Sequence, residues 1–123
     1  MTNSNFVFLE KEFPILFTIG SVAEYNLHTD PVTTLWKLRV FEEKPYENTL
    51  HNRIRVLEDE RVLQPNIASL VHNIKHKGNA AAHDSKGSIE DAKTMLFSAF
   101  KVAKWFYQSY STENRDIADV KFS

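Results

Sequence analysis

Apolar residues recur every three or four positions along most of this chain, which is the spacing of amphipathic α-helices. A short apolar segment comes first, over residues 6–13, and stops before Pro14. Residues 14–27 then follow helical spacing, with Leu16, Ile19, Ala23 and Leu27 on one side. The start of the chain therefore predicts an apolar lead-in followed by a first helix.

Capping signals mark where further helices begin. Asp30-Pro31 is an N-cap followed by proline at the first helical position, where the missing N–H of proline needs no partner. Asn48-Thr49 and Gln64-Pro65 mark two more starts. The stripes that these helices are expected to bury are Val32, Leu35, Trp36, Leu38, Arg39 and Phe41, then Leu50, Ile54 and Leu57, then Ile67, Leu70, Val71 and Ile74.

Two interruptions are expected to end these helices. Lys44-Pro45 breaks the first stripe, and Gly78 is a glycine C-cap for the helix that starts near residue 65. The last helix begins at Ser88, which with Asp91 forms a capping signal. Its long stripe predicts core packing and consists of Ala92, Met95, Leu96, Ala99, Val102, Ala103, Phe106 and Tyr107.

The pattern changes after Ser111, where the chain is polar and aperiodic until Ile117. We interpret residues 1–110 as a single helical bundle domain and residues 111–123 as a tail or a linker toward a following domain. Three glycines and four prolines are few for an all-β domain with many tight turns. With 123 residues and 42% hydrophobic content, the predicted fold is all-α, a compact bundle of about five helices.

Charge and composition argue against several functions. Fifteen basic and sixteen acidic residues give a net charge of -1, so the total charge gives no sign of a strongly basic surface for nucleic acid. The chain has no cysteine, which excludes disulfides and thiolate metal sites. It also lacks a glycine-rich phosphate loop, an apolar membrane span and a signal-peptide pattern. We therefore expect no cofactor, no metal, no membrane partner and a cytoplasmic location.

Several short segments, in order and with approximate spacing, resemble one known family. These segments are residues 4–9, Ala23-Glu24-Tyr25, Asp30-Pro31 through Leu35, Lys37-Leu38-Arg39 with Phe41, His72 with Gly78-Asn79, Ala81 and His83, and residues 103–107 with Trp105. They are similar to motifs of the N-terminal helical domain of the restriction (R) subunit of type I restriction-modification enzymes. The resemblance covers about residues 4–110 and departs between Phe41 and Asn48, where that family usually has a longer helix and loop.

The resemblance implies a HEPN-like bundle that acts as an accessory unit. ATP-dependent DNA translocation and DNA cleavage would belong to domains C-terminal to it in that family. The partners implied are other domains or subunits of a restriction complex, with DNA or RNA as a further partner. An alternative implied by the resemblance is a stand-alone, defence-related protein that consists of the same domain without the C-terminal domains.

A second hypothesis, also from the resemblance, is a divergent HEPN ribonuclease. In active members an arginine precedes a histidine by a few residues, so that the guanidinium holds the phosphate while the imidazole moves a proton. The corresponding positions before His83 hold His76, Lys77 and Gly78. Lysine supplies a charge without the bidentate fork, so His83 and Lys77 are the catalytic candidates of this hypothesis only. A third hypothesis is a homodimeric scaffold that associates through the last helix.

The structural interpretation of the same stretch is a tight helix junction. Gly78 would end one helix in the left-handed conformation, Asn79 would cap the next turn, and His83 would bond a neighbouring helix end. Elsewhere, Arg39 is expected to pair with a carboxylate such as Glu24, because an unpaired buried guanidinium is costly. Trp36 and Trp105 are expected to be core anchors.

The candidate binding residues lie close together in sequence. His72 and His76 have the spacing of a two-histidine zinc pair, but Asn73 stands where a metalloprotease motif has glutamate, so we predict no metal. The candidate contacts to a phosphate backbone are Lys75, His76, Lys77 and Lys86. The simpler alternative is a solvated basic end, which suits the C-terminus of a helix dipole.

Overall fold

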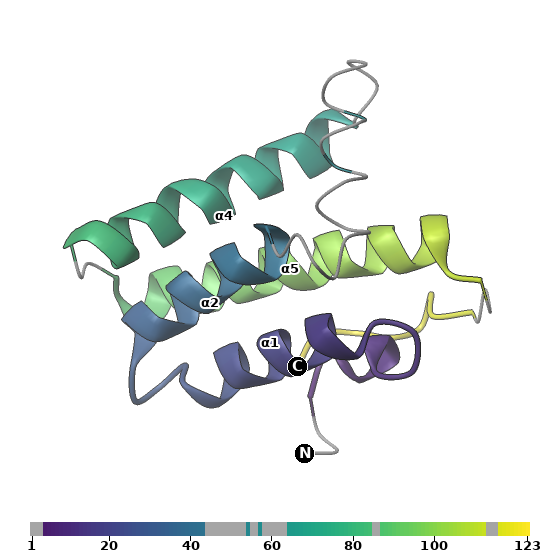
Figure 1. Cartoon of the computed structure of the whole chain (residues 1–123), viewed down its shortest axis with the longest axis horizontal. Helices are drawn as coiled ribbons and strands as arrows, with labels where there is room; N and C mark the ends of the chain where they lie inside the picture. Colours follow the sequence, from purple (N-terminus) through teal and green to yellow (C-terminus); the bar gives the residue numbers. More distant parts are fainter. Residues whose placement is uncertain (1–3, 44–53, 55–56, 58–63, 85–86, 113–115) are drawn as a thin grey trace.

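The computed structural model describes residues 4–43, 54, 57, 64–84, 87–112 and 116–123. Over these residues the chain forms four α-helices and one 3-10 turn, with no strand, which confirms the all-α prediction. The elements, labelled as in Figure 1, are η1 (Val7–Leu9), α1 (Pro14–Tyr25), α2 (Pro31–Glu43), α4 (Pro65–Asp84) and α5 (Ile89–Tyr110).

Helix α2 holds the bundle together. It contacts α1, α4 and α5, and α4 and α5 also contact each other. In Figure 1, α4 lies along the top, α1 lies along the bottom, and α2 and α5 run between them. The core therefore lies around α2 and α5, and one side of α4 closes it from above.

The start of α2 follows the predicted capping chemistry. The Asp30 carboxylate accepts hydrogen bonds from the backbone N–H of Thr33, at 3.1 Å, and from the Thr33 hydroxyl. One turn further, the buried hydroxyl of Thr34 donates to the carbonyl of Ala23 in α1, at 2.7 Å. These bonds fix the connection between α1 and α2, and the second one was not predicted from the sequence.

The last helix also begins and packs as predicted. Ser88 is the N-cap of α5, and its side chain accepts a hydrogen bond from the backbone N–H of Asp91. Every residue of the predicted stripe is buried. The stripe that a homodimer would use therefore packs within the chain, and the large apolar side chains that the described part of α5 shows to solvent are Ile89 and Phe97.

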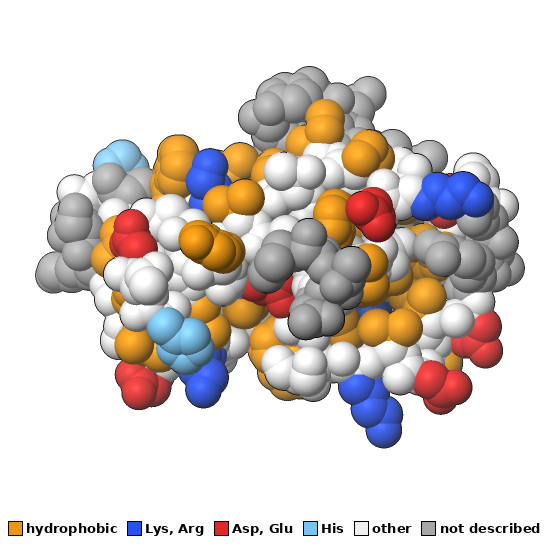
Figure 2. All heavy atoms as spheres, turned by 90° about the horizontal axis from the view of Figure 1, so that it is seen from below, with side chains coloured by type: hydrophobic (Ala, Val, Ile, Leu, Met, Phe, Trp, Pro, Cys, Tyr) orange, Lys and Arg blue, Asp and Glu red, His pale blue; other side chains and the backbone are white. Residues whose placement is uncertain are grey.

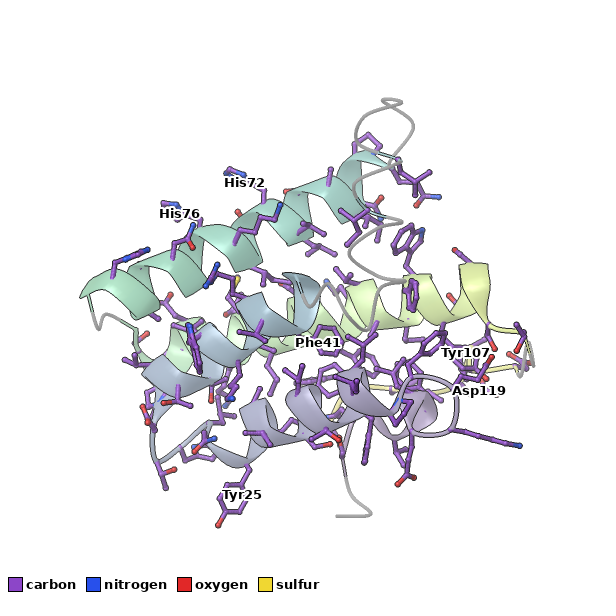
Figure 3. The ribbon with its side chains drawn as sticks, viewed as in Figure 1. Tyr25, Phe41, His72, His76, Tyr107 and Asp119 are labelled. Carbon is purple, nitrogen blue, oxygen red and sulfur yellow. The ribbon has the colours of Figure 1, made fainter. Side chains whose placement is uncertain are left out.

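The apolar lead-in supplies much of the aromatic core. Phe6 lies 5.4 Å from Phe41, measured between ring centroids, and Phe8 lies 5.7 Å from Tyr107 in an edge-to-face arrangement. Gly20 of α1 makes room for Phe6, because a Cβ at position 20 would come within 2.8 Å of that ring. Figure 3 shows Phe41 and Tyr107 in the interior of the bundle.

The predicted end of α4 at Gly78 is wrong. The helix continues to Asp84, so there is no junction at Gly78 and Asn79 is not a cap. Gly78 is buried against α2, and a Cβ there would lie 2.5 Å from Cβ of Arg39 and 3.1 Å from the carbonyl oxygen of Leu35. The glycine therefore permits close helix packing, while the alanine run that follows has high helix propensity and continues the helix.

On α2, the exposure of Trp36 differs from the prediction, and Glu24 is not the partner of Arg39. Trp36 is 39% exposed, with the Lys37 ammonium 4.9 Å from its ring centroid, so it is no core anchor. The Glu24 carboxylate does not hold Arg39. It accepts hydrogen bonds from the Ser4 hydroxyl and from Asn5 instead, while Arg39 lies against Gly78 on α4. Trp105 is partly buried at the edge of the core.

The aperiodic C-terminal segment contributes to the core. Ile117 is buried, and Val120 and Phe122 pack against the same cluster. The Lys104 ammonium donates to the carbonyls of Ala118 and Val120, and the backbone N–H of Ser123 donates to Asn5, at 2.9 Å. Residues 116–123 are thus part of the folded unit, which the absence of a helical pattern did not predict.

One predicted helix falls mostly outside the described residues. Of the segment expected from Asn48-Thr49, the structure describes Ile54, which is buried, and Leu57. Lys86, one of the predicted phosphate contacts, also lies outside the described residues.

Candidate functional site

The most distinctive surface is the solvent side of α4. On one side the helix buries Ile67, Val71, Ile74, Gly78 and Ala81. On the other side it exposes a row of imidazole, amide and hydroxyl groups that we call the α4 outer face, formed by Ser69, His72, Asn73, His76, Asn79 and His83. Figure 3 shows His72 and His76 extending from α4 away from the bundle.

The two labelled imidazoles lie parallel to each other. The rings of His72 and His76 have centroids 6.5 Å apart and an interplanar angle of 12°. Residues four apart lie one above the other on a helix, so both imidazoles can contact the same ligand. Among the residues that the structure describes, no group of three or more histidine, cysteine, aspartate or glutamate side chains converges to hold a metal ion.

The predicted basic cluster is only partly assembled. The Lys77 ammonium lies 3.3 Å from a carboxylate oxygen of Asp91, with side chains 41% and 39% exposed, so it joins α4 to the first turn of α5. An ion pair this exposed contributes at most about 1 kcal/mol, yet it compensates much of the local charge. Lys75 is half-buried, while His76 and His83 are exposed. The α4 outer face is therefore polar and rich in donors rather than strongly basic.

On the opposite side of the molecule, the described residues show no concentration of positive charge. Figure 2, seen from below Figure 1, shows Lys and Arg side chains spread among Asp and Glu, with apolar groups between them. At the connection between α1 and α2, the Asp30 carboxylate takes part in local hydrogen bonds. At the start of α2, hydrogen bonds from the Thr33 hydroxyl and backbone N–H lower the pKa of the Asp30 carboxyl from its ordinary value. That carboxylate serves the helix cap.

A pocket between α4 and α5 was not predicted. It has a volume of about 500 Å³, and we call it the α4–α5 pocket. Its lining residues are Gln64, Asn66, Ile67, Leu70, Lys101, Lys104, Trp105, Gln108 and Ser109. The signal in the sequence was the spacing of Lys101, Lys104, Trp105 and Gln108, which places all four on one side of a helix.

Comparison with known proteins identifies the family. The model of DUF4145, described as a domain of unknown function, matches residues 33–115, which is more than half of the chain. The chain belongs to the DUF4145 family. The matched range contains all of α4 and α5 and nearly all of α2, so both the α4 outer face and the α4–α5 pocket lie in the part that defines DUF4145.

A curated relative gives this DUF4145 domain a biological context. The chain is 33% identical over 120 residues to the type I restriction enzyme EcoKI endonuclease subunit of Escherichia coli (strain K12). The match covers 88% of this chain but 10% of that protein, so the chain corresponds to a small part of the relative. The predicted relation to a type I restriction enzyme subunit is therefore confirmed as a similarity to one region of it. No solved structure matches the chain.

The described helices are too short or too polar to span a membrane. The apolar residues of α4 and α5 lie on one side of each helix and pack into the bundle.

Proposed function

We propose that this chain is a non-catalytic accessory domain of the HEPN-like type, related to a part of type I restriction endonuclease subunits, which binds nucleic acid through the α4 outer face. The observation that carries the proposal is the division of α4. Its inner side is closed against α2 and α5, while its outer side presents His72, His76 and His83 to solvent. The similarity to a restriction endonuclease subunit supports nucleic acid as the partner.

The chemistry of this face suits contacts to a sugar-phosphate backbone. Imidazole N–H, amide N–H₂ and hydroxyl groups donate to phosphate oxygens, and such contacts position a protein without reading sequence. Because Lys77 is paired with Asp91, the described residues of the α4 outer face offer few full positive charges. Each neutralised phosphate adds about 0.9 to the salt dependence of log K for duplex DNA, so we expect weak binding with a shallow salt slope.

The test is binding of labelled duplex DNA and structured RNA at low salt. The double variant His72→Ala/His76→Ala should lose most of the binding, because both rings leave the α4 outer face. The matched control is His28→Ala, which removes an exposed imidazole from the connection between α1 and α2. Equal binding by wild type and the double variant would refute this surface as the contact. If neither nucleic acid binds to the wild type, the face would instead have to contact another part of a restriction complex.

The ribonuclease hypothesis remains as a second candidate because of one observation. The side chain of Arg39 lies against Gly78, and Gly78 is one of the positions where the resemblance to HEPN ribonucleases expects an arginine before His83. Helix α2 thus brings an arginine to the inner side of α4, while His83 stands on the outer face, so this pair would have to reach one phosphate around the helix. RNA cleavage by wild type, His83→Ala and Arg39→Lys decides between the two functions. Equal background from all three would end the ribonuclease hypothesis.

A further inference from the structure

The C-terminal segment (residues 116–123) runs back along α5 and packs on it through apolar side chains (Figure 1). Ile117 is buried, and Val120 and Phe122 pack against the core cluster. The ring of Phe122 lies 5.5 Å from that of Phe100 in α5, measured between centroids. The segment contains a turn, in which the Val120 N–H donates to the carbonyl of Ile117, but no helix or strand. It therefore lies on the bundle in the way that an extended peptide lies in a binding groove.

Polar side chains of the bundle hold the backbone of this segment. The Lys104 ammonium donates to the carbonyl of Val120, at 2.8 Å, and to that of Ala118, at 3.4 Å. The backbone N–H of Ser123 donates to the side-chain oxygen of Asn5, at 2.9 Å. In peptide recognition, main-chain hydrogen bonds supply affinity and side-chain pockets supply specificity. The same division is present here, because the groove contacts both the backbone and the apolar side chains of the segment.

Cavities lined by described residues lie beside each half of the segment. One, of about 650 Å³, is bordered by Ile117 and Val120 together with Phe8 of η1. The other, of about 470 Å³, is bordered by Phe122 and Ser123. The segment thus contacts the core through its apolar side chains while its edges face open space. Regions with few buried contacts open at a lower free energy than the core of a domain.

The chain is anchored separately at the end of α5. The Glu12 carboxylate accepts a hydrogen bond from the backbone N–H of Thr112, at 2.9 Å, and another from the Ser111 hydroxyl. These bonds do not involve the C-terminal segment, so they can persist when it leaves its groove. The part that can detach therefore begins after Thr112.

We propose that the C-terminal segment exchanges between copies of this chain: it leaves its groove beside η1 and α5 as a unit, and the groove then takes the same segment of a second copy. A second copy fits because it supplies the same apolar side chains and backbone carbonyls at the same spacing. Exchange of an identical element is a low-cost route to dimers, since each contact that is lost is made again. This exchange goes beyond the proposed nucleic-acid contact and does not involve the α4 outer face.

The absence of cysteine from the chain allows a direct test by disulfide trapping. A chain with Asn5→Cys, carrying an affinity tag, is mixed with an untagged chain with Ser123→Cys under mild oxidation. Each chain is present at about 1 mM, because the segment of the same chain competes with an effective concentration of that order. The matched control replaces Ser123→Cys by Thr18→Cys, an exposed position on α1, and measures disulfides that form by collision. The expected result is a covalent heterodimer that forms several times faster with Ser123→Cys than with Thr18→Cys.

Two competing peptides test whether the segment docks in the groove of the second copy. An acetylated peptide of residues 116–123 in excess should suppress the Ser123→Cys heterodimer and leave the Thr18→Cys control unchanged. The same peptide with Phe122→Ala should be about tenfold less effective, because it lacks the ring that packs on Phe100. The peptide with Lys121→Ala should compete as well as the unaltered one, since Lys121 is exposed.

A variant of the receiving chain gives an independent measurement. Phe122→Ala added to the Asn5→Cys chain weakens the hold of its own segment, so heterodimer formation with Ser123→Cys should rise more than collision with Thr18→Cys. Circular dichroism checks that this variant remains folded. The proposal is overturned if Ser123→Cys reacts no faster than Thr18→Cys, or if the two altered peptides compete equally. It is also overturned if Phe122→Ala accelerates both reactions alike.

Discussion

The two sides of α4 differ in how far their side chains are buried in the bundle. The inner side is closed, with Ile74 at 1% exposure and Gly78 so close to α2 that an added methyl group has no room. The outer side presents His72, Asn73 and His76 to solvent on the same turns. The comparison teaches that one helix can hold the bundle through one side and keep the other for recognition. Substitutions on the two sides should therefore change different measurements.

The largest effect is expected from the inner side. Ile74→Ala removes a fully buried aliphatic group and should lower the free energy of unfolding by about 2–5 kcal/mol. The matched control is His76→Ala, two residues along on the exposed side, which should change stability by less than about 0.5 kcal/mol. Urea unfolding followed by circular dichroism measures both. Similar losses for the two variants would remove the distinction between the sides.

Gly78→Ala sharpens the comparison, because two effects oppose each other. Alanine favours a helix over glycine by about 1 kcal/mol, whereas overpacking a close contact costs about 1–3 kcal/mol. At position 78 the new Cβ would meet Arg39 Cβ at 2.5 Å and a backbone carbonyl at 3.1 Å, and neither group can swing away. We therefore expect net destabilisation. Asn79→Ala, on the exposed side, should be neutral or slightly stabilising, and a Gly78→Ala variant as stable as wild type would contradict close packing here.

The ion pair between α4 and α5 should matter less. A double-mutant cycle with Lys77→Met and Asp91→Asn should give a coupling free energy below about 1 kcal/mol, because both side chains are well exposed. The coupling should decrease further at high salt. A coupling well above that value would mean that Lys77 belongs to the structural side of α4.

A pH-dependent effect is expected at Asp30, away from both sides of α4. The Thr33 hydrogen bonds lower the pKa of its carboxyl in the folded state. Its contribution to stability is therefore present above the unfolded-state pKa and is lost as the pH falls through the folded-state pKa. Asp30→Ala should unfold more easily than wild type at neutral pH, and the difference should shrink in acid. A difference that is unchanged in acid would show that the charged cap is not its source.

The sequence predicted helix starts better than helix ends. Asp30-Pro31, Gln64-Pro65 and Ser88 mark the observed starts because capping and proline act locally. Gly78 misled the prediction, because a glycine that ends a helix and one that admits a neighbouring helix look alike without the neighbour. Helical spacing also predicts Trp36 in the core, but in the folded bundle Trp36 is exposed, because the packing of α2 buries other residues of the stripe.

The candidate sites were predictable only in part. The exposed histidines of α4 follow from helical spacing once the buried stripe is known, so His72 and His76 were found together. The α4–α5 pocket could not be found, because it requires the start of α4 to lie beside the end of α5. The position of the Lys104 ammonium likewise depends on the C-terminal segment, because it donates to the carbonyl of Val120. No periodic pattern in the sequence predicts how that segment packs.

The central claim, that the outer side of α4 is the contact surface and the inner side is structural, is tested most directly by one binding isotherm. Labelled duplex DNA or structured RNA is titrated at low salt with the His72→Ala/His76→Ala variant, which should remain folded. The account predicts that its affinity falls by about tenfold or more relative to wild type and to His28→Ala, since two donors to phosphate are removed. An isotherm that superimposes on that of the wild type would contradict it.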